Sequence, residues 1–318
     1  MRTTGSRRGG TQVPDGLGCG HLLGTRVPAG APPTGSSTRG VDRGRSVVWM
    51  RLSGVRVVVT GATSGLGAAM ADALLRAGAT VAVSARPGPR LDDAVDRWRR
   101  DGLAVAALPM DVRRPDSVEA AVAQCMSRWG GVDVVVNNAG IGMRTVNPRF
   151  FSDPRPFFEV SPEAFADVIE TNLTGYFLVA RAFAPVFVAQ GGGRFVNVSM
   201  NHETMRRRGF VPYGPSRAGA ESLSLIMTED LRPFGITVNM LLPGGATMTG
   251  MIPDELPEEA RGSLLPAAVM GPPIVFLASA EAAGLTGERI VATDFESFLT
   301  ALRSAGHSDR SARARAGN

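Results

Sequence analysis

The chain has 318 residues, of which 44% are apolar and 20% charged, so it is long and apolar enough to bury a sizeable core. Two cysteines and three scattered histidines form neither a disulfide framework nor a metal site, which predicts a reducing, cytoplasmic location and no bound metal. No apolar run reaches the roughly 18 residues that span a bilayer, so we expect no membrane segment.

The net charge of +5 does not predict a nucleic-acid-binding face, because it comes from the two ends of the chain. Residues 1–49 contain seven arginines and two aspartates, and residues 303–318 contain four arginines and one aspartate. The intervening residues carry a net charge of −3, so we expect no nucleic-acid partner. All 34 basic residues are arginine, which indicates a composition bias that acts on the whole chain.

Three segments follow from composition. Residues 1–49 are rich in Gly, Arg, Thr and Pro and lack apolar periodicity, which predicts a disordered extension. Met50 is followed at once by the pattern of a globular domain, so this extension is interpreted as an upstream segment that need not be translated; a functional arm is the less favoured interpretation. We expect the folded domain over residues 50–302 and a disordered basic tail over residues 303–318.

From residue 55 onward, apolar strands alternate with helical stretches. Strands are predicted at 55–60, 80–85, 103–111, 194–199 and 288–293, and a strand with its following loop is predicted at 132–140 and at 236–245. Helices are predicted at 65–78, 91–102, 117–130, 162–190 and 215–232. This alternation is typical of an α/β fold, a Rossmann-like doubly wound parallel sheet with helices on both faces, in a single domain.

The turn after the first predicted strand reads TGATSGLG over residues 60–67. Glycines in such a turn let backbone N–H groups approach a pyrophosphate, and the following helix N-terminus adds positive potential. A plain turn would also be rich in glycine, but the strand–turn–helix context favours a nucleotide site. The spacing is T-G-x-x-x-G-x-G.

With this turn and further landmarks, the sequence resembles the short-chain dehydrogenase/reductase family over about residues 55–295. The landmarks are Asp111, NNAG at 137–140, TNLTG at 171–175, NVS at 197–199, YGPSR at 213–217 and PGGATMT at 243–249. The resemblance implies an NAD(P)-dependent oxidoreductase that transfers a hydride between nicotinamide and a carbonyl or alcohol substrate. It also implies a homodimer or homotetramer built through the long helices near 162–190 and 213–233.

The resemblance further implies that Asp111 meets the adenine and that Asn137 and its neighbours line the cofactor trough. The second strand ends in Ser84, Ala85 and Arg86, with no acid to accept hydrogen bonds from the adenosine ribose. Arg86 can pair with a 2′-phosphate, which favours NADP(H) over NAD(H); a solvated loop arginine is the alternative. The expected cofactor-binding residues are Gly61, Thr63, Ser64, Gly65, Leu66, Gly67, Arg86, Asp111, Val112, Asn138, Ala139, Gly140, Tyr213, Arg217, Pro243, Gly244, Ala246 and Thr249.

Tyr213 is one of two tyrosines, and the resemblance makes it the catalytic acid/base. The i, i+4 spacing puts Tyr213 and Arg217 on one helical face, where a positive charge can stabilise the phenolate. The family has Lys at this position. Arg217 can supply charge and bind the ribose, but it cannot release a proton.

Two further positions complete the expected catalytic set. The family's catalytic Ser falls at Met200, whose thioether cannot donate a hydrogen bond. Ser199 or Asn201 is the candidate replacement, although neighbouring strand residues face opposite sides, and the absence of any direct substitute stays open. Asn172 matches the family's fourth catalytic residue, with a structural helix-kink Asn as the alternative.

The loop at 143–162 is longer than the family usually has and contains four Phe and four Pro. With the Met-rich loop at 247–270 it predicts a hydrophobic lid for a bulky or aromatic substrate; a packing or subunit contact is the alternative. Arg206–Arg208 can attract an anion, but a solvated run is the favoured interpretation. A cofactor-binding pseudoenzyme, slowed by Met200 and Arg217, is the second functional hypothesis.

Overall fold

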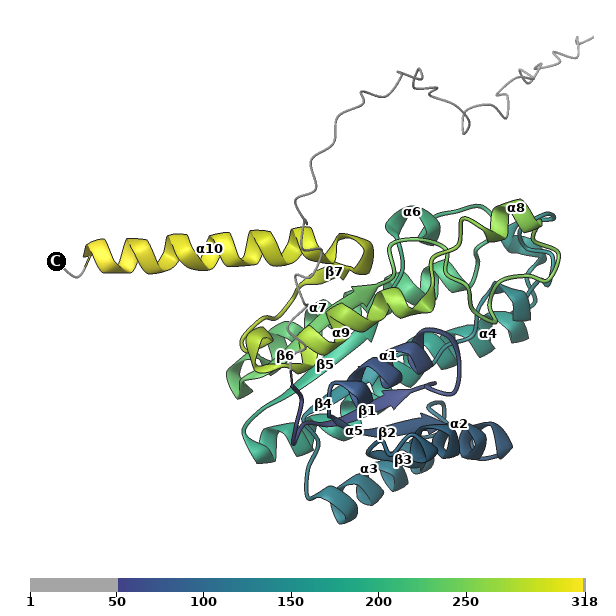
Figure 1. The fold of residues 1–318 in the computed structure, drawn as a ribbon. Helices are drawn as coiled ribbons and strands as arrows, with labels where there is room; N and C mark the ends of the chain where they lie inside the picture. The colour runs from purple at the N-terminus through teal and green to yellow at the C-terminus, as the bar shows by residue number, and fades with distance from the viewer. Residues whose placement is uncertain (1–50, 317–318) are drawn as a thin grey trace, which may run out of the picture. The chain divides into compact units, whose positions relative to one another are not determined.

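The centre of the fold is a sheet of seven parallel strands in the order β3-β2-β1-β4-β5-β6-β7 (Figure 1). It is described from a computed structural model that places the backbone of residues 51–316 and the side chains of residues 51–305. The strand order reverses between β1 and β4, which creates a switch point at their carboxyl ends. The strands are β1 Arg56–Thr60, β2 Thr80–Ala85, β3 Val105–Pro109, β4 Val134–Asn137, β5 Gly193–Val198, β6 Ile236–Leu242 and β7 Arg289–Val291.

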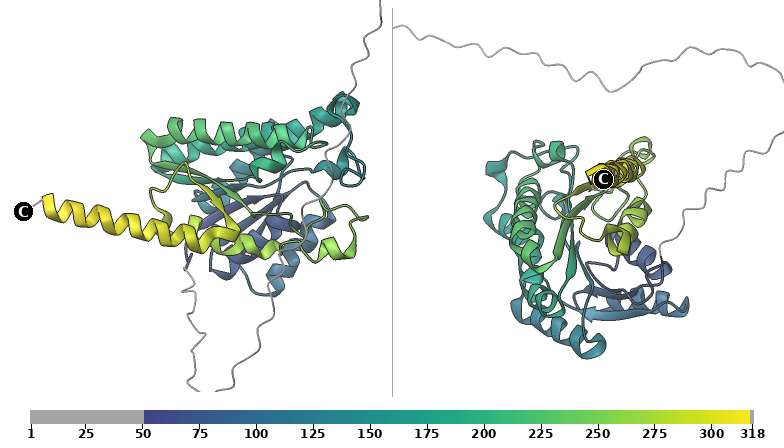
Figure 2. Two further views of the ribbon diagram at one scale, coloured as in Figure 1. Left: turned by 90° about the horizontal axis from the view of Figure 1, so that it is seen from above. Right: turned by 90° about the vertical axis from the view of Figure 1, so that its left-hand side faces the viewer.

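Helices connect the strands and cover both faces of the sheet (Figure 2), which confirms the predicted doubly wound fold. Two of them, α6 and α8, are single turns, and α6, α8, α9 and α10 were not predicted. The helices are α1 Gly65–Arg76, α2 Pro89–Arg100, α3 Pro115–Trp129, α4 Pro162–Ile169, α5 Gly175–Gln190, α6 His202–Met205, α7 Tyr213–Leu231, α8 Glu258–Arg261, α9 Gly271–Ala278 and α10 Phe295–Ala316.

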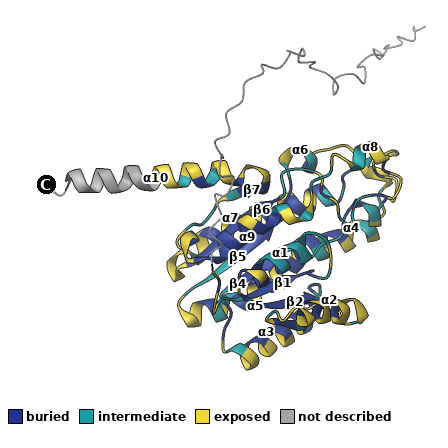
Figure 3. Ribbon diagram, in the orientation of Figure 1, coloured by how far each residue is buried: buried dark blue, intermediate teal, exposed yellow. Residues whose placement is uncertain are grey.

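The core consists of two apolar layers, one on each face of the sheet. Alternate strand residues face opposite layers: Val57 and Val59 pack with α1, α2, α9 and α10, whereas Val58 packs with α3, α5 and α7. Because both faces are covered, the strands are continuous apolar runs. Figure 3 shows the result, with buried strands and exposed residues on the outer faces of the helices.

Local sequence signals set several helix ends. Pro115 and Pro162 stand in the first turns of α3 and α4, where a missing N–H costs little, and the Ser161 hydroxyl caps α4. Gly130 and Gly191 end α3 and α5 in the left-handed conformation that suits glycine. Helix boundaries could therefore be read closely from the sequence at these sites.

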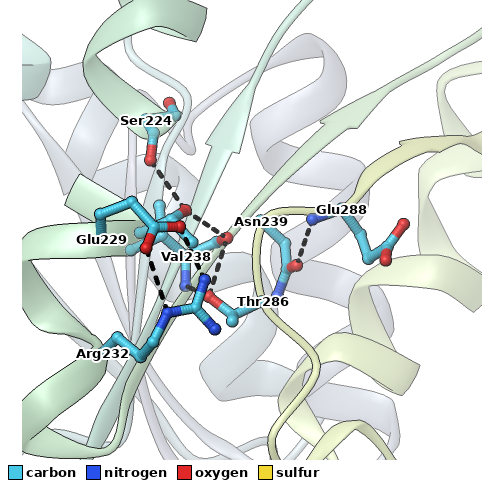
Figure 4. A network of polar contacts seen from close by, with 8 residues as sticks. Ser224, Glu229, Arg232, Val238, Asn239, Thr286 and Glu288 are labelled. Carbon is cyan, nitrogen blue, oxygen red and sulfur yellow. Dashed lines mark hydrogen bonds and ion pairs between the residues drawn. The ribbon is translucent and has the colours of Figure 1, made fainter. Parts of the chain in front are cut away.

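Polar contacts fix the loop before the last strand, β7, to β6 (Figure 4). The Val238 N–H donates to the Thr286 hydroxyl at 3.0 Å. Asn239 accepts from the Glu288 N–H at 3.0 Å. Its side chain also donates to the Leu285 carbonyl at 2.8 Å. These bonds satisfy the backbone of the loop before β7, so that the strand is held at the edge of the sheet.

The predicted helix at 162–190 is one continuous rod, Pro162–Gln190, with a π-helical segment at Glu170–Thr174 between α4 and α5. It is the one helix within residues 51–316 that is long and apolar enough to cross a membrane by length and composition. That is a weak indication, because core helices pass the same test, and here Phe183 and Phe187 are fully buried against the sheet.

The C-terminal segment differs from the sequence-based expectation. Residues 303–318 were predicted to be a disordered tail, but the backbone of α10 is helical as far as Ala316. The helix begins on the core through buried Phe295 and Leu299, and the Ala and Arg residues that follow favour helix. The predicted extension at residues 1–49 lies outside the described residues.

Candidate active site

A cavity of about 1310 Å³ is lined by residues that follow the carboxyl ends of β1 to β6, where doubly wound sheets bind ligands. It brings together most of the predicted site residues. These are Gly61, Thr63, Ser64, Gly65, Leu66, Gly67, Arg86, Asp111, Val112, Asn138, Ala139, Gly140, Pro243, Ala246 and Thr249, together with Tyr213, Arg217 and Ser199. Gly244 and Asn172 were predicted as well, but they do not line the cavity.

The turn between β1 and α1 is shaped by its glycines. Gly61 has φ +63°, and a Cβ there would lie 2.7 Å from Ala139 Cα. A Cβ at Gly67 would lie 2.4 Å from the Gly61 carbonyl oxygen. Helix α1 begins without a side-chain cap at Ser64, so its first N–H groups are free for an anionic ligand. This cradle fits the pyrophosphate of a dinucleotide.

Asn138 fastens this turn to the end of β4. Its amide donates to the Thr60 carbonyl at 2.8 Å and to the Gly61 carbonyl at 3.1 Å, and its backbone N–H donates to the Thr60 hydroxyl. Asn137 was expected to line the trough, but it is buried and donates to Asn197 of β5 at 2.9 Å. Alternation along β4 explains the difference, since adjacent residues face opposite sides.

Asp111 follows β3 and lines the cavity. Its carboxylate accepts hydrogen bonds from the Arg113 backbone and side chain, and these bonds hold the pKa of Asp111 below its usual range. Arg86 is exposed, lines the cavity after β2, and contributes positive charge near Asp111. The residues at the end of β2 thus present a cation and no acid.

Arg217 contacts both tyrosines of the chain. Its guanidinium carbon lies 5.3 Å from the ring centroid of Tyr213, on the same helix, and 5.4 Å from that of Tyr176, on α5. Nη1 donates to the Tyr176 hydroxyl at 2.6 Å and to the Val198 carbonyl at 3.1 Å. The predicted pairing of Tyr213 with Arg217 therefore includes a third group, Tyr176, which sequence spacing did not reveal.

The Arg217 side chain is buried, and its Nε has no hydrogen-bond partner among the described residues. Desolvation alone would lower the pKa of Arg217, but the neighbouring Tyr176 and Tyr213 raise it above its ordinary value. The guanidinium therefore stays charged. Burial raises the pKa of Tyr176, so this residue stays a neutral phenol beside the cation.

Asn172 lies in the π-helical segment and is fully buried. It accepts from the Ile141 N–H at 2.9 Å, and donates to the Ile141 carbonyl at 3.0 Å and to the Ser216 hydroxyl at 3.2 Å. A Cβ at Gly140 would lie 2.5 Å from Arg217 Nη2 and 3.0 Å from Asn172 Oδ1. The loop after β4 therefore passes tightly between these two side chains.

The side chains on either side of Met200, which stands at the family's Ser position, already form hydrogen bonds within the chain. The Ser199 hydroxyl donates to Glu221 at 2.5 Å, and the Asn201 amide donates to the Gly244 carbonyl at 3.0 Å. Glu221 also accepts from Arg289 and contacts His202. Burial raises the pKa of Glu221, but the bonds from Ser199, His202 and Arg289 lower it, and the net shift is downward. Met200 itself lines the cavity.

Two lid segments, residues 143–162 and 247–270, border the substrate end of the cavity and are joined to each other. Arg144 forms an ion pair with Asp254, and the Ser152 hydroxyl donates to Glu255 at 2.6 Å. Phe150 packs with Met143, Met200, Met205 and Phe210 in a cluster against Tyr213. Of the four lid phenylalanines, Phe150 and Phe151 line the cavity, whereas Phe157 and Phe158 are exposed.

Sequence reasoning missed several residues of the site. Tyr176 directly follows the TNLTG landmark, yet its helical periodicity is that of a core residue. Glu221 is one turn beyond Arg217 on α7, and this i, i+4 spacing could have placed it near strand five. Phe210 and Arg207 lie in a loop, where no periodicity indicates which way a side chain faces.

Comparisons with known proteins agree with this geometry. The sequence profile described as short chain dehydrogenase matches residues 56–260. The chain is 32% identical to the 3-oxoacyl-[acyl-carrier-protein] reductase FabG of Vibrio cholerae, over 76% of this chain and 96% of that protein. It is also 32% identical to gluconate 5-dehydrogenase of Gluconobacter oxydans, over 61% of this chain and 72% of that one.

Solved structures are similar as well. A gluconate 5-dehydrogenase from Burkholderia cenocepacia, in complex with NADP and tartrate, is 26% identical with a TM-score of 0.67, covering 76% of this chain and 94% of that one. A short-chain type dehydrogenase/reductase from Mycobacterium marinum is 29% identical with a TM-score of 0.66 over the same shares.

The fold and site define a dinucleotide-binding α/β oxidoreductase, and the chain belongs to the short-chain dehydrogenase/reductase family. It is an NAD(P)-dependent oxidoreductase that transfers a hydride between nicotinamide and a carbonyl or alcohol carbon. The pseudoenzyme hypothesis gains no support from these relatives.

Proposed function

We propose that the chain is an NADP(H)-preferring dehydrogenase or reductase with Tyr213 as its acid/base. The observation that carries the proposal is the pair formed by Tyr213 and Arg217 at the start of α7, beside the glycine-lined cavity. When bound, the nicotinamide supplies or accepts the hydride. The residues of the chain hold the cofactor, orient the substrate oxygen and move a proton at the Tyr213 hydroxyl.

Arg217 serves as a fixed charge and as a ligand for the nicotinamide ribose. Its cation lies 5.3 Å from the Tyr213 ring, where it stabilises the phenolate. Because a guanidinium does not deprotonate in the accessible pH range, the proton reaches Tyr213 from solvent or from a hydroxyl, and not through residue 217. Asn172 supports this network by holding the Ile141 backbone and the Ser216 hydroxyl.

Ser199 is the nearest candidate for the second hydrogen-bond donor to the substrate oxygen. Its hydroxyl lines the cavity but donates to Glu221, so it acts on a substrate only when that bond is exchanged. Met200 offers no donor. We therefore propose that polarisation of the substrate carbonyl depends mainly on Tyr213.

The preference for NADP(H) rests on Arg86, which lines the cavity where the chain has no acid. Loss of a charge-assisted hydrogen bond to a 2′-phosphate weakens binding by about tenfold or more. Arg86→Gln should therefore raise the Kd for NADPH by that factor and leave the Kd for NADH unchanged, in fluorescence titrations. Arg128→Gln, on the exposed surface of α3, is the control. Equal changes for both cofactors would contradict the preference.

The substrate is proposed to be a bulky or aromatic carbonyl compound or alcohol, because apolar side chains form the substrate end of the cavity.

The long helices carry exposed Phe177, Leu225 and Ile226, which supports assembly as a homodimer or homotetramer through α5 and α7. A cytoplasmic location fits the free, buried Cys125. Light scattering at several concentrations measures the assembly.

The experiment that tests the function is NADPH oxidation over a panel of bulky ketones, aldehydes and quinones. Tyr213→Phe removes the proton donor and should lower kcat at least a hundredfold, with a far smaller change in the Kd for NADPH. Tight NADPH binding without turnover on any compound, and with no effect of Tyr213→Phe, would overturn the proposal.

A further inference from the structure

We propose that the substrate is an amphipathic oxo or hydroxy carboxylic acid, whose apolar body lies along the lid and whose carboxylate is bound by Arg207. This inference rests on the proposed function, because it names the substrate class of the same site. It is carried by the placement of charge in the cavity, by the contacts of Arg207, and by the scarcity of free hydrogen-bonding groups on the lid.

Charged side chains are distributed unevenly along the cavity. Among the described residues that line it, five surround the turns after β2 and β3, where the cofactor adenosine is expected: Arg86, Arg90, Asp111, Arg113 and Asp167. Arg217 is buried beneath Tyr213. The one remaining charged residue is Arg207, in the loop after α6, next to the apolar cluster behind Tyr213.

Arg207 is held on an aromatic surface. Its guanidinium carbon lies 5.2 Å from the Phe151 ring centroid and 5.4 Å from that of Phe210. These cation–π contacts are not hydrogen bonds to an acceptor atom, so the guanidinium keeps its N–H donors to bind a carboxylate in a forked geometry. Arg206 and Arg208 on either side are exposed, and they add positive potential that attracts an anion.

Three acids of the lid are already paired with other lid residues. Asp254 binds Arg144, Glu255 accepts from Ser152, and Asp153 binds Arg149. Among the described residues, no carboxylate forms an ion pair with Arg207. An anionic ligand would supply the missing partner.

The rest of the substrate end is apolar, which argues against a sugar acid with many hydroxyls. Its walls include Met143, Phe150, Met200, Met251, Ile252 and Leu256. Three polar side chains that line it donate to carbonyl groups of the chain: Thr145 to Gly142, Asn201 to Gly244 and Ser263 to Ala260. A polyol would bury hydroxyls against methionine and phenylalanine without partners, at a free-energy cost that an alkyl or aryl body avoids.

The test is a series of methyl-ketone acids, from 4-oxopentanoate to 10-oxoundecanoate, each compared with its methyl ester, with NADPH as the reductant. At the chain length that fits, the acid should exceed its ester in kcat/KM by about tenfold to hundredfold, the range of one forked charge-assisted hydrogen bond. Arg207→Gln should bring this ratio to about one. Arg207→Lys keeps the charge without the fork and should give an intermediate ratio, whereas Arg206→Gln is the matched control and should leave the ratio unchanged.

A binding measurement makes the test independent of turnover. Titration of 6-phenylhexanoate and its amide into the NADP-saturated protein, followed by calorimetry, should show tighter binding of the acid, and Arg207→Gln should abolish the difference. Esters reduced as fast as acids at every length, or equal binding of acid and amide, would overturn the inference while leaving the oxidoreductase function intact. If no ketone is reduced, the proposed function fails, and the calorimetric comparison still decides the role of Arg207.

Discussion

The Tyr176 hydroxyl is the group whose removal tests most directly how this active site tolerates arginine. It accepts from Arg217 at 2.6 Å and donates to the Val198 carbonyl at 3.2 Å, and all three groups are buried. Tyr176→Phe keeps the ring and its packing and removes only the oxygen. The variant therefore isolates the two hydrogen bonds from the contact between the ring and the guanidinium.

The size of the effect follows from those two bonds. A hydrogen bond to a buried charged group contributes about 1.5–3 kcal/mol and a neutral one about 0.5–1.5 kcal/mol. The Val198 carbonyl keeps its bond from Arg217, so the free energy of unfolding should fall by about 2 to 4 kcal/mol. For a domain of this size, Tm should fall by roughly 5 to 15 °C. A less tightly held guanidinium should also lower kcat about tenfold.

The chain supplies its own matched control, because its second tyrosine contacts the same guanidinium carbon at 5.3 Å. Tyr213→Phe also removes one phenolic oxygen, but from the cavity wall. Thermal melts at one fixed protein concentration should show a large loss for Tyr176→Phe and a small one for Tyr213→Phe. Turnover should show the reverse order. If both variants melt within about 2 °C of the parent and Tyr176→Phe retains full kcat, Tyr176 does not hold Arg217 and the reasoning is wrong.

Three further predictions concern the surroundings of this pair. Glu221→Gln should lower the free energy of unfolding by about 1–3 kcal/mol at pH 7. Because folding lowers the pKa of the Glu221 carboxyl, its contribution to stability is present above the unfolded pKa of about 4.3 and is lost as the pH falls through the folded pKa. Urea unfolding at pH 7 and pH 4 should therefore show a weaker pH dependence in the variant than in the parent, and an identical dependence would contradict this. Gly140→Ala should displace Arg217 and lower kcat at least tenfold in steady-state assays, whereas Gly262→Ala, whose added Cβ would come no closer than 3.5 Å to its nearest neighbour, should be silent; equal effects would refute the packing argument. Met200→Ser should raise kcat several-fold by adding a donor, with Kd for NADPH unchanged, and no gain in either kcat or kcat/KM would show that the site has adapted to methionine.

The strand and helix pattern could be predicted well because both faces of the sheet are covered. Buried strands such as β1 are short apolar runs bounded by turn residues, and they cannot be confused with the long helices between them. Helix α10 was missed because its N-terminal turn depends on a tertiary contact, the packing of Phe295 and Leu299 on the core. Periodicity reports a helix face only where the chain has enough apolar residues to mark it.

Contacts of the site between residues close in sequence could be predicted, whereas contacts between residues far apart in sequence could not. The i, i+4 spacing of Tyr213 and Arg217 survives in the structure as a contact on one helix face. Tyr176 is 41 residues from Arg217 along the chain, and only the packing of α5 beside α7 brings them together. The hydrogen bond from Ser199 could not be predicted from the sequence either, since its partner Glu221 belongs to another element.

The π-helical segment at Glu170–Thr174 has a mechanical consequence for the whole rod from Pro162 to Gln190. An α-helix turns about 100° per residue, so one extra residue in a turn offsets the two halves of the rod by about that angle. Because of this offset, two side chains of one continuous helix can face different partners. Asn172 hydrogen-bonds the Ile141 backbone, and Phe183 packs in the core. Deleting a single residue from this segment would restore an unbroken α-helix and force the chain to give up one of the two alignments. The π-helical segment thus sets the rotation of the active-site half of the rod relative to the half that packs in the core.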